Sequence, residues 1–180
     1  MGGDRPYTKA ELEQIERDQH DPQWLAWLDS ENMNAQIDVF LNETVPDMPD
    51  SPWTAEGLDR AERDMLERFS GMDDVDRAEN WVVADQFSRF IGEVFRRNFE
   101  GRWFNAPSMG GARYPNFGPA IRHEWVDAYL DVGNLITATV HRKWGDNLST
   151  IFANSSESYR EWVSAGRPTL AEQLNLGQSW

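Results

Sequence analysis

FSRFIGEVFRRNFEGRWF, residues 87–104, is the stretch of this sequence that decides the fold. Its apolar residues recur three and four positions apart, which is the spacing of a helix with one face toward a core. Arg96 and Arg97 lie near its end, where the helix macrodipole favours positive charge, and Gly101 is a residue type that often ends helices. We therefore predict a central helix that stops at Gly101 and a strand that begins about Trp103. The residues expected to face the core are Val83, Phe87, Phe90, Ile91, Val94, and either Phe95 or Asn98.

The central helix is expected to begin well upstream and to cover residues 73–101. Asp73, Asp74 and Asp76 lie at the expected amino end, where the macrodipole favours negative charge. Gly92 lies in the interior, where glycine costs roughly 1 kcal/mol relative to alanine. We expect the close approach of another backbone to explain the glycine.

Several shorter helices are expected before the central one. Thr8 and Glu11 have the spacing of a capping box, in which each side chain bonds the other residue's main-chain N–H. The first helix starts there and Pro22 interrupts it. Residues 45–53, VPDMPDSPW, contain three prolines and predict a loop, and Thr54 is a good cap for the helix that follows.

The sequence after Gly101 changes character and predicts a β-hairpin. Residues 102–107 and 119–125 each have the pattern of a short strand. The eleven residues between them, SMGGARYPNFG at 108–118, are rich in glycine and turn-forming residues. A hairpin with a long connection is the simplest arrangement of these three segments.

The carboxyl-terminal third is more ambiguous. Residues 125–144 suit a helix, although the β-branched run within them would also suit a strand; we favour the helix. Residues 148–154 are expected to add a short extended piece. A final helix is expected to begin at a cap formed by Ser155 or Ser156 and to end at Gly166.

These expectations describe an α+β protein, with a helix-rich amino-terminal part packed on a small antiparallel hairpin or sheet and with a long carboxyl-terminal helix. Residues 1–7 are interpreted as a loose end. A single domain is expected over 8–166, helical at 8–100 and mixed at 101–166. Residues 167–180 form a tail that could add one more helical turn.

Charge is distributed unevenly along the chain. The net charge is −14. Residues 1–100 hold 24 acidic and 10 basic side chains, whereas residues 101–180 hold 7 of each. This excess disfavours nucleic-acid binding, which depends on neutralising phosphates, and it would attract a basic protein partner. Solubility alone is an alternative explanation of the acidic surface.

Cysteine is absent from the 180 residues. Its absence excludes disulfides, zinc–thiolate sites and a cysteine nucleophile. No apolar run approaches the roughly 18 residues that a membrane-spanning helix needs, and the first residues lack the apolar segment of a secretory signal. We interpret the chain as cytoplasmic, without a membrane segment and without a cofactor.

Carboxylates suggest one possible enzymatic function. Magnesium prefers oxygen ligands, and Glu62, Glu67, Glu79 and Asp85 could supply them from two neighbouring helices, as in a magnesium-dependent hydrolase. The spacings do not match the paired carboxylates of such enzymes, because Glu62 and Glu67 are five residues apart. Solvated helix faces with arginine partners are the alternative. The three histidines fit no metal-binding motif.

Aromatic residues near the proline loop and the hairpin are the best candidates for contact with a partner. Tryptophan, tyrosine and arginine dominate the energetics of protein interfaces, although such residues can equally cover a core. A homo-oligomer built on the tryptophan-rich amino-terminal helices is a further alternative. The partner-binding candidates are Trp53, Trp103, Arg113, Tyr114, Phe117 and Trp125.

The helix that ends in Gly-Arg-Trp and leads into a strand resembles a pattern in small uncharacterised bacterial proteins, many of them actinobacterial. Some of these are similar to the immunity proteins of polymorphic toxin systems. The resemblance covers residues 87–125, and the long segment 108–118 replaces a tight turn of the family. It implies a binding module without enzymatic activity, which could neutralise a basic toxin.

Overall fold

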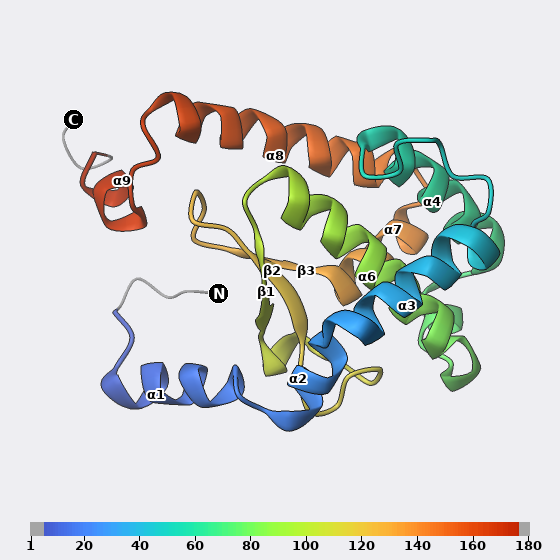
Figure 1. Cartoon of the computed structure of the whole chain (residues 1–180), viewed down its shortest axis with the longest axis horizontal. Helices are drawn as coiled ribbons and strands as arrows, with labels where there is room; N and C mark the ends of the chain where they lie inside the picture. The colour runs from blue at the N-terminus through green and yellow to red at the C-terminus, as the bar shows by residue number, and fades with distance from the viewer. Residues whose placement is uncertain (1–5, 177–180) are drawn as a thin grey trace.

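The structure is a computed structural model and describes residues 6–176. Helices surround a three-stranded antiparallel sheet of order β1-β2-β3. Figure 1 shows α8 and α1 at opposite edges of the molecule with α6 between them. The predicted α+β class is confirmed. No helix within the described residues has both the length and the apolar character required to cross a membrane.

Helix α6, Trp81–Asn98, forms the centre of the molecule, as predicted. It contacts α3, α4, α7 and two strands of the sheet. Ala84 and every residue of 86–95 are buried. Other elements cover the helix on several sides, so its buried surface is wider than the single apolar face that was predicted. Phe87 and Phe90 pack against Phe40 at ring-centroid distances of 5.0 and 4.8 Å.

The prediction of one continuous helix over 73–101 is wrong. The chain forms the short helix α5, Met72–Val75, then the 3₁₀ turn η2, Ala78–Asn80, before α6 begins. Arg77 has an extended backbone between the two. Side-chain bonds compete with a continuous helix here: Asp74 accepts from the main chain of Ser70, and Asn80 donates to the Asp74 carbonyl at 2.7 Å.

The amino-terminal segments are α1 (Lys9–Asp18), α2 (Pro22–Leu28), α3 (Ser30–Val39) and the π-helical turn η1 (Phe40–Thr44). The capping box at Thr8 and Glu11 is present. Asp21 caps α2, so that Pro22 begins the second helix as well as ending the first. Of the loose end predicted at 1–7, residues 1–5 lie outside the described part of the chain.

The predicted hairpin is confirmed. Strand β1 (Arg102–Asn105) pairs antiparallel with β2 (Pro119–Arg122), with Trp103 opposite Ile121. Gly92 is explained differently from the prediction. An added Cβ there would overlap the indole ring of Trp103, so a side chain rather than a backbone makes the close approach.

The helix favoured for 125–144 is wrong in its first part. Residues Tyr129–Asp131 form strand β3, which pairs with β2, and α7 covers only Val132–Arg142. The main-chain N–H and C=O groups of β3 find hydrogen-bond partners along the edge of β2, so these residues are extended and do not form a helix. The Asp131 carboxylate then accepts the Asn134 N–H at 3.0 Å and caps α7.

Helix α4, Ala55–Arg68, begins at Thr54 as predicted and packs against α8, Asn147–Ser164. The extended piece expected at 148–154 and the cap expected at Ser155 or Ser156 are both wrong, because these residues lie inside α8. Leu148 is fully buried in the core. In the tail, α9 covers Leu170–Leu176.

Candidate functional site

Three of the predicted partner-binding residues meet in one aromatic cluster, formed by Trp24, Trp27, Trp103, Tyr114 and Phe117 and here named the tryptophan cluster. Trp24 and Trp27 stack at 5.5 Å, and Trp103 meets Trp27 edge-on at 5.0 Å. Trp24, Trp27, Tyr114 and Phe117 are all less than a tenth exposed. The cluster therefore attaches α2 and the hairpin loop to the body of the protein.

Asp85 on α6 fixes the polar side of the tryptophan cluster. Its Oδ1 accepts hydrogen bonds from the Trp27 indole at 2.7 Å and from the Tyr114 hydroxyl at 2.6 Å. Its Oδ2 accepts from Arg89 at 2.7 Å. Burial and the neighbouring carboxylate raise the pKa of the Tyr114 hydroxyl, which keeps this phenol protonated and donating.

Of the other three predicted residues, Trp53 packs against the edge of the tryptophan cluster and Arg113 lies 5.5 Å from the Tyr114 ring centroid, whereas Trp125 lies elsewhere. Trp53 lies under the guanidinium of Arg97, 3.8 Å from its ring centroid. Trp125 donates from its indole to the Phe99 carbonyl at 3.0 Å. Arg113 has a side chain that is 6% exposed and borders a hollow of about 360 Å³ beside the 108–118 loop. The six residues thus do not form one continuous surface, and their role in partner binding stays a prediction.

The carboxylates considered for a magnesium site are also dispersed. Glu62 is fully buried and accepts the main-chain N–H groups of Asn147 and Leu148. Asp85 is engaged in the tryptophan cluster, whereas Glu67 and Glu79 are exposed. In the part of the chain that the structure describes, no three acidic or histidine side chains come close enough to hold a metal ion.

An acidic surface follows α3, η1 and the proline loop. The sequence has no lysine or arginine between Arg17 and Arg60. The carboxylates of this surface, which are named below, form no ion pair with any residue in the described range 6–176. Figure 1 shows α3 in front of α6, against which it packs. The acidic surface consists of the exposed residues Glu31, Asp38, Glu43, Asp47 and Asp50.

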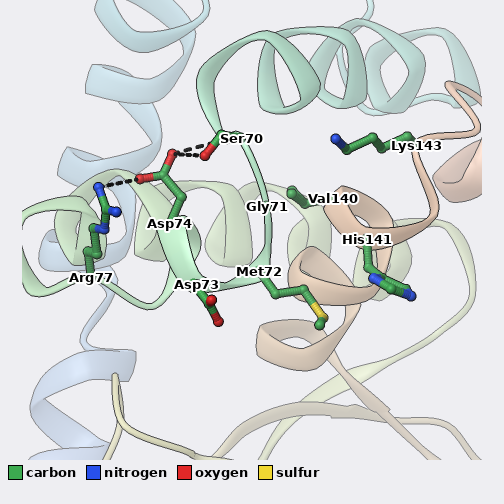
Figure 2. Close-up of a pocket in the computed structure, with 9 residues that line it drawn as sticks. All are labelled: Ser70, Gly71, Met72, Asp73, Asp74, Arg77, Val140, His141 and Lys143. Atoms are coloured by element: carbon green, nitrogen blue, oxygen red, sulfur yellow. Dashed lines mark hydrogen bonds and ion pairs between the residues drawn. The ribbon is translucent and has the colours of Figure 1, made fainter.

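A cavity of about 570 Å³ lies between the α4–α5 junction and the end of α7. Figure 2 shows His141 and Lys143 on the α7 side, and Asp74 bonded to Ser70 and Arg77 on the other side. Positive and negative groups are mixed around this cavity. It therefore has no clear preference for a charged ligand.

Sequence reasoning missed the role of Glu93. This buried carboxylate binds Arg96 and Arg97 and also accepts from the Trp103 indole at 2.7 Å. The spacing of Glu93 to the two arginines, three and four residues along a helix, is a pairing signal that was available in the sequence. Its bond to Trp103 depends on the turn at Gly101.

Comparisons with protein-family models, with curated proteins and with solved structures found no match to this chain.

Proposed function

We propose that this protein is a cytoplasmic binding protein without catalytic activity, and that its acidic surface engages a basic protein partner. The observation that carries the proposal is that the exposed carboxylates between Glu31 and Asp50 make no ion pair with any of residues 6–176. Glu31 and Asp38 are seven residues apart on α3 and therefore project from the same side of the helix.

Electrostatics would give such a surface its selectivity. Like charges held together on a folded surface repel one another, and a basic partner relieves this repulsion as it binds. The same field accelerates association and weakens as salt screens it. The resemblance to immunity proteins points in the same direction, since it implies a binding module that could neutralise a basic toxin.

A charge-matched comparison tests this surface. We would measure binding of a lysine- and arginine-rich twenty-residue peptide, and then of basic proteins captured from the host, by calorimetry at 25 and 300 mM salt. The test variant combines Glu31→Gln, Asp38→Asn and Glu43→Gln. The control variant combines Glu157→Gln, Glu161→Gln and Glu172→Gln, which lie on exposed parts of α8 and α9 and remove the same charge.

We expect the test variant to bind about tenfold more weakly and the control variant to stay within twofold of the natural protein. Equal weakening of both variants would show that only net charge matters and would contradict a specific surface. Light scattering coupled to sizing chromatography tests the homo-oligomer alternative in the same samples.

A further inference from the structure

A second surface of opposite charge lies where α6 passes into β1. It is a cleft of about 400 Å³ between this turn and the first residues of α3. Arg96, Arg97 and Arg102 border it, and Glu93 is the only carboxylate among its described lining residues. The local charge is therefore positive in a protein whose net charge is −14. We name it the arginine cleft.

Glu93 holds two of the arginines in fixed positions. Its side chain is 6% exposed and pairs with Arg96 through two hydrogen bonds of 2.7 and 2.9 Å and with Arg97 at 2.9 Å. Burial would raise the pKa of this carboxyl, but the bonds from Arg96, Trp103 and Arg97 outweigh burial and lower it. The carboxylate stays ionised and keeps both guanidinium groups oriented.

Donors remain available on all three arginines. A guanidinium has five N–H donors. Arg96 directs Nε and Nη2 to Glu93, and Arg97 directs only Nε there, so Nη1 of Arg96 and both terminal nitrogens of Arg97 have no hydrogen bond to residues 6–176. The Arg102 side chain is 61% exposed, and among residues 6–176 its only partner is Glu124, in an ion pair of 3.7 Å.

The floor of the arginine cleft is apolar. Leu28, Met33 and the half-buried indole of Trp103 line it. The Trp103 ring is fixed by its bond to Glu93 and by its packing on Gly92. A fixed aromatic floor beside oriented cations is the arrangement that binds an anionic group attached to an apolar body.

We propose that the arginine cleft binds an organic anion, in which a carboxylate or phosphate group meets Arg97 and Arg102 and an apolar body rests on Trp103. The anion could be a free small molecule or an acidic side chain of a peptide beside an apolar residue. The site adjoins the acidic surface at the start of α3, where Ser30 and Asn34 line the cleft on either side of Glu31 in the sequence. Its anion-binding groups, Arg97 and Arg102, lie on α6 and β1 and have the opposite charge, so either proposal can fail without the other.

Four probes test the site in the full-length protein: phenyl phosphate, phenylacetate, inorganic phosphate, and a blocked tripeptide with glutamate between two leucines. Binding is measured by calorimetry and by the NMR signals of the indole N–H groups, with Trp103 assigned from the Trp103→Phe variant. We expect the two aromatic anions to move the Trp103 signal and to leave that of Trp144, which is 63% exposed and outside the cleft, unchanged.

Inorganic phosphate should bind at least tenfold more weakly than phenyl phosphate because it has no apolar body. Binding of the tripeptide as tight as that of phenylacetate would identify peptide side chains as the source of the anion, and weaker binding would identify free small molecules. Arg102→Ala and Arg97→Gln should each weaken phenyl phosphate about tenfold. Arg160 is an exposed arginine on α8 outside the cleft. The control variant Arg160→Ala should change the affinity for phenyl phosphate less than twofold.

The proposal is overturned if none of the four probes moves the Trp103 signal at 5 mM. It is also overturned if inorganic phosphate binds as tightly as phenyl phosphate, or if Arg102→Ala binds phenyl phosphate as tightly as the natural protein does. Because Arg102 is mostly exposed, its variant tests the site without disturbing the core.

Discussion

The carboxylate of Glu62 on α4 caps the first turn of α8, although 85 residues separate it from Asn147. It accepts the N–H of Asn147 at 3.1 Å and that of Leu148 at 2.8 Å. Glu62 and both of these residues are buried. A buried carboxylate is thereby compensated by the amino end of a helix, where N–H groups have no partner within the helix itself.

Replacing Glu62 by alanine should therefore lower the free energy of unfolding by about 3 kcal/mol, because two buried N–H groups lose a charged acceptor. Urea unfolding followed by circular dichroism measures this change. Glu67→Ala, on an exposed part of the same helix, is the control and should stay within about 0.5 kcal/mol. Equal effects of the two substitutions would mean that Glu62 is not needed as a cap.

Gly92→Ala should destabilise the protein by about 2 kcal/mol, because the new methyl group would overlap the Trp103 ring and force it to move. Its thermal midpoint should fall, and the Trp103 indole signal should shift as its bond to Glu93 is disturbed. Gly71→Ala is the matched control, since no atom lies within 4 Å of its added Cβ and its backbone is extended. A thermal midpoint for Gly92→Ala equal to that of Gly71→Ala would contradict this packing.

His123 should make stability depend on pH. Burial lowers its pKa from 6.5 to about 4, against a smaller opposing effect of the Phe95 main chain. Between these values the unfolded chain binds a proton that the folded protein does not, so stability falls as pH falls from 6.5 to 4. The loss from this group is at most about 3 kcal/mol.

Unfolding free energies at pH 7.0, 5.5 and 4.5 test this prediction. His123→Gln, which does not titrate, should reduce the loss between pH 7.0 and 4.5. Glu93 also contributes to acid destabilisation, because its pKa in the folded protein is lower than the ordinary pKa of 4.5. Its contribution is lost only at pH values below 4.5, outside the range of this test. A variant with the same pH dependence as the natural protein would show that His123 is not responsible.

Lys143 ends α7 in the left-handed backbone conformation, at φ 54° and ψ 35°. This conformation costs a residue with a side chain about 1 kcal/mol, whereas glycine adopts it readily. Lys143→Gly should therefore stabilise the protein by about 0.5 kcal/mol once the greater freedom of glycine in the unfolded chain is included. Differential scanning calorimetry against Lys143→Ala, which keeps the strained backbone, separates this effect from loss of the charge; equal midpoints would contradict it.

The sequence by itself determined the elements whose signals are local. Apolar spacing predicted the body of α6, Thr8 and Thr54 predicted helix starts, and the glycine-rich segment between two short strands predicted the hairpin. These signals act within a few residues, so they can be recognised without knowing where the rest of the chain lies. The pairing of Glu93 with Arg96 and Arg97 also depends on residues only three and four positions apart, so it could have been predicted in the same way. The helix end predicted at Gly101 comes earlier: α6 ends at Asn98, and Glu100, at φ 52°, adopts the left-handed backbone.

Only the tertiary structure decided the elements that depend on distant partners. Residues 129–131 are a strand because β2 offers its edge to them, and α8 begins at Asn147 with Glu62 as its cap. The indole of Trp103 explains Gly92 and forms the floor of the arginine cleft. Each outcome depends on a contact between two different elements, and Glu62 and Asn147 are 85 residues apart. A pattern of neighbouring residues within one element does not contain those contacts.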